Sequence, residues 1–197
     1  MLDIVAQLLP PHYSPISQAE SDLGVGPYGW VMDINFVVRG ILSLAVVYGL
    51  YRVWPVSRAL PRISLALVGA WGVGAFILAF NPADVSGVTT VHGTIHGITA
   101  ILVFLFVAVG VVGISEAMPR EFSWAAVRPY ARTLAVLTAI SLVVLAIGSV
   151  VHRVEVHYFG LLERIFIGFA LLWMLIVSVL LLRAEPNVEA SASKASV

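Results

Sequence analysis

The chain has 197 residues, of which 60% are apolar and only 11% are charged, and its formal net charge is zero. Soluble domains usually carry roughly 25% charged residues. The composition therefore excludes an ordinary water-soluble fold and indicates a membrane protein whose partners include membrane lipids. The balanced charge gives no reason to expect a nucleic-acid partner. The absence of cysteine excludes disulfides and thiolate metal ligands.

The first 29 residues are expected to lie outside the membrane-spanning part. Residues 1–9 are too few to cross a bilayer and predict a short interfacial helix, which Pro10 and Pro11 end. Residues 12–29 are rich in Pro, Gly and Ser and predict an extracytoplasmic loop. This loop contains the sequence Glu20-Ser21-Asp22-Leu23-Gly24.

Five apolar runs follow, each close to the roughly 20 residues that a spanning helix requires. The predicted fold class is therefore an all-α integral membrane bundle of five transmembrane helices within residues 30–183. Residues 184–197 predict a disordered tail. The five runs are Ile34–Val53, Ile63–Phe80, Thr94–Ile114, Thr133–Val151 and Phe159–Leu182.

The basic residues predict the orientation of the bundle. Arginines follow the first and third runs, and the tail carries Arg183 and Lys194, whereas the opposite loops carry only Arg153. Lys and Arg accumulate on the cytoplasmic side of a membrane. We therefore expect a multi-pass cell-membrane protein with its N-terminus outside and its C-terminus in the cytoplasm.

Four histidines are expected at the outer ends of the helices. His92 and His96 are four positions apart, which places both rings on one face of a helix. Helix N-termini disfavour imidazolium, so this pair and His157, at the start of the fifth helix, should be neutral, as metal coordination requires. His152, expected to end the fourth helix, should favour the cation. Three neutral histidines are typical of catalytic zinc sites. We predict a divalent metal, preferably zinc, held by His92, His96 and His157 or His152, and the alternative is that these rings only bond carboxylates and loop carbonyls.

Nearby polar residues provide candidates for catalysis. The candidates for a fourth metal ligand, for a residue that orients the ligands or for the general base are Asp22, Asp84 and Glu163. Of these, Asp22 or Glu163 is preferred as the general base. Ser21 is a candidate nucleophile, although a Ser-Asp pair in a loop is also typical of a helix cap or turn.

The polar residues of the first helix have two interpretations. Asn35 and Arg39 share a face, and together with Arg164 they are candidates for holding an anionic head group in a cavity open to the outside. Alternatively, because a charge inside an apolar run normally finds a partner, Arg39 forms an ion pair with Glu163 or with Asp33.

Haem is the competing cofactor, with His96 and either His152 or His157 as axial ligands. Covalent attachment is excluded because the chain has no Cys-x-x-Cys-His sequence. No second histidine pair lies deeper in the apolar runs to carry electrons across the membrane. Haem is therefore disfavoured.

The order of several short motifs resembles a known family. The motifs are Ser21-Asp22-Leu23-Gly24, Asn35-Phe36, Asn81-Pro82, His92-Gly93-Thr94-Ile95-His96 and Gly160-Leu161-Leu162-Glu163-Arg164. From about residue 12 to 182 the chain resembles domain of unknown function 998, a family of small prokaryotic multi-pass membrane proteins. The resemblance implies a membrane protein and no established activity.

A looser similarity concerns the site alone. The transmembrane metal-dependent hydrolases that include alkaline ceramidases combine Ser, Asp and three His around a zinc. His92 and His96 match their HxxxH pair, whereas Ser21 and Asp22 match only by residue type. This is an analogy between sites and not between folds.

Two functions fit these residues. The first is a metal-dependent hydrolase acting on a lipid-type substrate at the outer face. The alternative is a non-catalytic lipid-binding protein or an accessory subunit of a membrane complex, in which the polar cluster is structural. A stripe of small residues, Ala66, Ala70 and Gly74, is expected to pack within the chain, with a homo-oligomer contact as the alternative.

Overall fold

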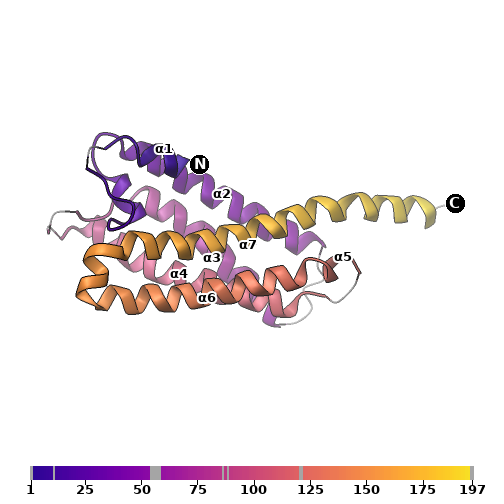
Figure 1. Cartoon of the computed structure of the whole chain (residues 1–197). Coiled ribbons are helices and arrows are strands. Elements are labelled where there is room, and N and C mark those ends of the chain that lie inside the picture. The colour runs from indigo at the N-terminus through magenta and orange to yellow at the C-terminus, as the bar shows by residue number, and fades with distance from the viewer. Residues whose placement is uncertain are drawn as a thin grey trace.

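The computed structural model is a bundle of helices (Figure 1). It describes residues 2–10, 12–53, 59–85, 87, 89–119 and 122–195, of which residues 2, 122, 123, 152, 153, 155, 156 and 183–195 are described by backbone alone. The elements are α1 (Leu2–Ala6), the 3-10 helix η1 (Glu20–Gly24), α2 (Gly29–Val53), α3 (Ala59–Ala79), α4 (Val91–Ala117), α5 (Phe122–Ala125), α6 (Arg128–Val150) and α7 (His152–Ala195).

Within the described residues, five helices are long and apolar enough to cross a membrane: α2, α3, α4, α6 and the His157–Leu182 part of α7. The predicted all-α bundle of five transmembrane helices is confirmed. The helices begin a few residues before the apolar runs, and at α4 a polar residue caps the start. There, the Thr90 side chain accepts the backbone N–H of Gly93 at 3.0 Å. The Asp84 carboxylate in turn accepts the Thr90 backbone N–H at 2.9 Å.

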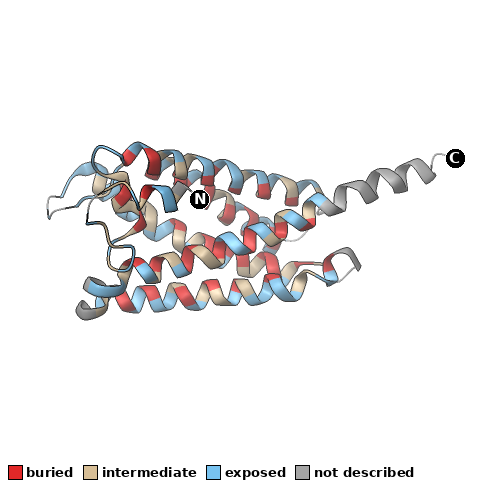
Figure 2. Ribbon diagram, turned by 45° about the horizontal axis from the view of Figure 1, so that its top comes forward, coloured by how far each residue is buried: buried red, intermediate tan, exposed pale blue. Residues whose placement is uncertain are grey.

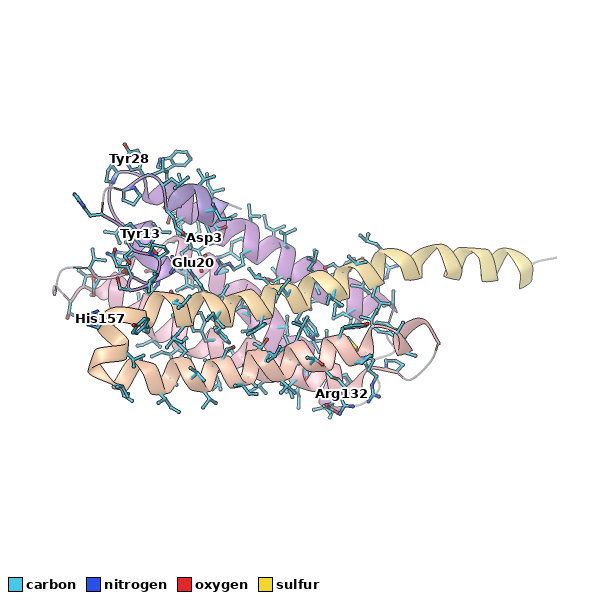
Figure 3. All side chains as sticks on the ribbon, in the orientation of Figure 1. Asp3, Tyr13, Glu20, Tyr28, Arg132 and His157 are labelled. Carbon is cyan, nitrogen blue, oxygen red and sulfur yellow. The ribbon has the colours of Figure 1, made fainter. Side chains whose placement is uncertain are left out.

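The five long helices form a closed ring, in which α2 packs on α3, α3 on α4, α4 on α6, α6 on α7, and α7 on α2. Successive helices run in opposite directions, so the connections fall at two ends. We call the end that holds η1, the α3–α4 loop and the start of α7 the histidine end, and the end that holds α5 the arginine end. Figure 3 shows Tyr13, Glu20 and His157 at the histidine end and Arg132 at the arginine end.

Close helix contacts depend on small residues. A Cβ at Gly40 of α2 would lie 2.8 Å from the carbonyl oxygen of Gly72 in α3, so the two backbones are nearly in contact. Of the predicted small-residue stripe, Gly74 is buried against Val103 of α4. Ala66, in contrast, is exposed. Only part of the stripe therefore packs within the chain.

Figure 2 shows exposed residues along the outward faces of the helices. Many of these residues are apolar, as expected where lipid replaces water. On α6, for example, Val136, Ile140, Val143 and Ile147 are all exposed. Several hydroxyl groups within the spans donate to carbonyls of their own helix. Ser43 donates to the carbonyl oxygen of Arg39 at 2.7 Å in this way.

The connection between α6 and α7 is shorter than the gap between the last two predicted apolar runs. α6 ends at Val150 and α7 begins at His152, so a single residue joins them. The backbone of α7 continues as a helix to Ala195. The side chains from residue 183 onward lie outside the described part, and the disorder expected for residues 184–197 stays a prediction.

Candidate ligand-binding site

A cavity of about 550 Å³ lies inside the bundle at the histidine end. Its lining residues come from η1 and the loop before it, and from all five long helices. Polar side chains gather where η1 meets the helices, and the remaining wall is aliphatic and aromatic. The polar lining residues are Glu20, Ser21, Arg39, His96, Ser149 and Glu163, and the apolar wall includes Phe36, Ala100, Phe104, Leu142, Leu145 and Ile167.

Arg39 and Glu20 form a buried ion pair in this lining. Nη2 of Arg39 donates to Oε1 of Glu20, and the side-chain amide of Asn35 lies 3.4 Å from the same oxygen as a second donor. The guanidinium carbon of Arg39 also lies 5.5 Å from the centre of the Phe36 ring, in cation–π contact. The charge of the arginine is thereby compensated within the protein.

Glu163 of α7 is buried and holds the start of η1. Its Oε2 accepts the backbone N–H of Glu20 at 2.6 Å. The predicted Arg39–Glu163 and Arg39–Asp33 ion pairs are therefore wrong. The loop before α2 folds back over the end of the bundle. It places Glu20 between α2 and α7, where Glu20 forms the ion pair with Arg39.

Arg164 fastens this loop to α7. Its Nη1 donates to the carbonyl oxygens of Pro15 and Gln18, each at 3.0 Å, and its Nη2 donates to the Tyr13 hydroxyl. A Cβ at Gly160 would overlap the same two carbonyls, so glycine is needed for this close approach. Burial raises the pKa of Tyr13 to about 12, so the hydroxyl stays protonated at physiological pH. Arg164 thus binds the loop and does not line the cavity.

His92 and His96 both bond to Asn81, at the end of α3. Nδ1 of His96 lies 2.6 Å from the Asn81 carbonyl oxygen, to which it can only donate. Nδ1 of His92 lies 2.9 Å from the side-chain oxygen of the same residue. His96 is buried and lines the cavity, whereas His92 is exposed. The two rings therefore share a helix face, as predicted, but only one of them reaches the cavity.

The two candidate residues of η1 are adjacent but differ in position. Ser21 lines the cavity, whereas Asp22 does not. Burial raises the pKa of the Asp22 carboxyl, and His96 and Arg164 partly oppose this rise. The structure thus brings Ser21, His96 and Glu163 to one cavity and leaves Asp22 beside it.

The predicted metal ligands do not come together in the described part of the chain. No group of three or more His, Asp or Glu residues there is placed to hold a metal ion. His157 is exposed, with its ring 6.3 Å from that of Tyr158. His152 was expected to end the fourth helix and so to favour the cation. It begins α7 instead, so this expectation is wrong. Because its side chain lies outside the described residues, metal or haem binding through His152 stays a prediction.

Among the lining residues that the sequence did not point out, Glu20 and Trp71 matter most for the chemistry of the cavity. Glu20 carried a weak signal, since Arg39 needed a partner and the loop before its helix is acidic. Trp71 carried none, because a tryptophan in an apolar run is expected to be core. Its ring is 2% exposed and lines the cavity, and its Nε1 has no hydrogen-bond partner among the described residues.

The fold and the cavity define the class: a multi-pass helical membrane protein with an internal cavity in one half of its bundle. Within that class, the chain belongs to the family described as a protein of unknown function (DUF998), whose model matches residues 1–180. Comparisons with curated proteins and with solved structures gave no match.

Proposed function

We propose that this protein binds one amphiphilic, lipid-type molecule in the cavity, with the polar head beside Glu20, Arg39, His96 and Glu163. The observation that carries the proposal is the unequal lining of the cavity, which is polar where η1 meets the helices and apolar along α4, α6 and α7. A volume of about 550 Å³ lies within the roughly 300–1,000 Å³ typical of small-molecule pockets. A ligand with a small polar head and an alkyl chain matches such a lining.

The proposed route of entry is lateral, between α4 and α6. Three residues that line the cavity are also exposed: Gly97 and Ile101 of α4, and Ala146 of α6. Ile101 is 72% exposed. At the arginine end the same two helices are in contact, where the Ser115 hydroxyl lies 3.3 Å from the Ala131 carbonyl oxygen. The ligand would therefore enter from the bilayer and not from water.

The orientation of the bundle decides which leaflet supplies the ligand. The arginine end carries the basic loops, and the positive-inside rule places such loops in the cytoplasm. The cavity then faces the outer leaflet of the cell membrane. This orientation is part of the proposal.

Binding fits the cavity better than metal-dependent hydrolysis. His96 is the one histidine that lines the cavity among the described side chains, and the lining carboxylates already have partners in Arg39 and in the Glu20 backbone. A zinc site would need ligands that the described residues do not bring together. A role as the lipid-binding subunit of a larger membrane complex is compatible with the same pocket.

The test is retention of lipid by the purified full-length protein, measured by native mass spectrometry after mild detergent extraction. Wild-type protein should retain about one amphiphile per chain. Gly97→Phe and Ala146→Phe should each reduce retention, because they fill the proposed entrance. A Cβ at Gly97 meets no atom within 4 Å, so the fold tolerates a side chain there.

Gly168→Phe is the matched control. A Cβ at Gly168 also meets no atom within 4 Å, but this residue does not line the cavity. Its variant should retain lipid as the wild type does. Equal retention by all four proteins, or absence of bound lipid from the wild type, would overturn the proposal.

A further inference from the structure

The charges around the cavity are already compensated within the protein. Arg39 is paired with Glu20, and Glu163 adds a second carboxyl group to the lining. Arg164 faces the loop carbonyls and the Tyr13 hydroxyl, away from the cavity. An anionic head group would therefore meet no free arginine and would lie beside carboxylates, at a cost that burial increases.

Two buried lining residues, Trp71 and His96, each hold a polar atom that is available to a ligand. Nε1 of Trp71 is a buried donor without a partner among the described residues, and unpaired buried donors are rare and costly. His96 donates through Nδ1 to the Asn81 carbonyl, and Nε2 is an acceptor when the ring is neutral. With a neutral His96 ring, these two side chains offer a ligand one donor and one acceptor.

Trp71 and His96 are both close to the pair formed by the Arg39 guanidinium and the Phe36 ring. The guanidinium carbon of Arg39 lies 6.0 Å from the centre of the Trp71 ring and 5.5 Å from that of Phe36. The rings of Phe36 and His96 are 6.3 Å apart. Trp71 and His96 thus line one cavity and are linked by a chain of contacts through Arg39 and Phe36. The proposal places one small head group between them.

We propose that the ligand is an uncharged lipid whose head is a hydroxyl group, such as a long-chain alcohol or an acylglycerol. A hydroxyl both accepts and donates a hydrogen bond, so it would accept from Trp71 and donate to His96. The alkyl chain would occupy the apolar wall. This inference rests on the proposed lipid-binding function and adds the chemical class of the ligand.

The first experiment varies the head group on one chain. Binding of hexadecane, hexadecanol, hexadecanoate and hexadecylamine to the purified full-length protein is compared at about pH 8, where a free carboxyl is ionised and a free amine is protonated. Hexadecanol should bind at least about tenfold more tightly than hexadecanoate, because the carboxylate loses hydration and lies beside carboxyl groups without gaining a partner. It should also bind more tightly than hexadecylamine, which tests whether the Glu163 carboxyl group takes an ammonium head instead. Tightest binding of either charged compound would overturn the hydroxyl assignment and leave lipid binding intact. If none of the four compounds binds, the proposed function itself fails.

The second experiment compares the same substitution at two tryptophans, Trp71 and Trp173. Trp71→Phe should weaken hexadecanol binding by about fivefold and leave hexadecane binding unchanged, because only the N–H donor to the head group is lost. Trp173→Phe is the control, since Nε1 of Trp173 is already bonded to the Ser115 hydroxyl at 2.8 Å and this residue does not line the cavity. It should change neither affinity. Equal weakening of both compounds by Trp71→Phe would assign the ring a packing role and overturn the hydrogen bond.

Discussion

Glu20 and Arg39 form an ion pair that joins a loop outside the spans to the interior of a membrane helix. Both side chains are less than a tenth exposed. The pair lies on the cavity lining and is reinforced by Asn35 and by the Phe36 ring. It fixes the shape of the polar part of the cavity and neutralises the arginine there.

Removing one member of this pair should be strongly destabilising. Glu20→Gln or Arg39→Met leaves the other charge buried without compensation, which typically costs about 3–5 kcal/mol. The double variant should recover a large part of the loss, because no unpaired charge is left. Thermal unfolding in detergent, with both single variants and the double variant, measures the coupling between the two residues.

The exposed ion pair at the arginine end provides the comparison. Arg132 and Glu116 lie 2.8 Å apart, and each side chain is 46% exposed. Glu116→Gln should cost no more than about 1 kcal/mol. Equal losses for Glu20→Gln and Glu116→Gln would show that the Arg39 pair is not buried in the folded protein.

A second prediction concerns the contact between the loop and α7. Gly160→Ala should destabilise the protein by about 1–3 kcal/mol, because the new methyl group overlaps the carbonyls of Pro15 and Gln18. Proteolysis within residues 13–19 should become faster as the loop separates from α7. Gly168→Ala, whose Cβ meets no atom within 4 Å, should leave both stability and proteolysis nearly unchanged. If the loop of Gly160→Ala resisted proteolysis as well as the loop of the wild type, the contact between the loop and α7 would be contradicted.

Asp22 predicts a dependence of stability on pH. Burial raises its pKa above the ordinary value of 3.8, so the folded state binds the proton more tightly than the unfolded state. The corresponding contribution to stability is present below the unfolded pKa and is lost as the pH rises through the folded pKa. Asp22→Asn should therefore raise the melting temperature relative to the wild type near pH 7, and this difference should disappear near pH 3. If the melting temperatures of the two proteins differed equally at pH 3 and pH 7, burial of the Asp22 carboxyl group would be contradicted.

The two histidines of the HxxxH pair should behave differently. His92→Ala loses one exposed bond to Asn81, so it should cost about 0.5–1.5 kcal/mol and leave lipid retention unchanged. His96→Ala removes a buried ring from the cavity lining and should reduce lipid retention. Metal analysis of the same samples tests whether His92 and His96 are zinc ligands. Stoichiometric zinc in the wild type that both substitutions abolish would favour a metal site.

The orientation can be tested because the chain has no cysteine. Thr89→Cys places a thiol in the α3–α4 loop at the histidine end, and Ser193→Cys places one in the C-terminal segment. A membrane-impermeant maleimide should label Thr89→Cys in intact cells and Ser193→Cys only after permeabilisation. The opposite labelling pattern would place the cavity in the cytoplasmic leaflet.

The sequence was sufficient to predict the five spans, since a lipid environment imposes long apolar helices that composition alone reveals. It also predicted that Arg39 lines an interior cavity, because Asn35 and Arg39 lie on one helical face. It could not identify Glu20 as the partner of Arg39, because that contact depends on the irregular path of the loop between α1 and α2. The bonds of His92 and His96 with Asn81 depend in the same way on how α3 ends.

The contact of the N-terminal loop with α7 has a consequence for biosynthesis. Pro15, Gln18 and Glu20 obtain their hydrogen-bond partners from residues about 145 positions later in the chain, such as Arg164 and Glu163. These bonds cannot form until the last of the five spans has been translated and inserted. Glu20 precedes Arg39 in the chain, so their ion pair can form before α7 is made. The loop that carries Glu20 is anchored only when α7 supplies Glu163 and Arg164, and the cavity closes as the concluding step of assembly.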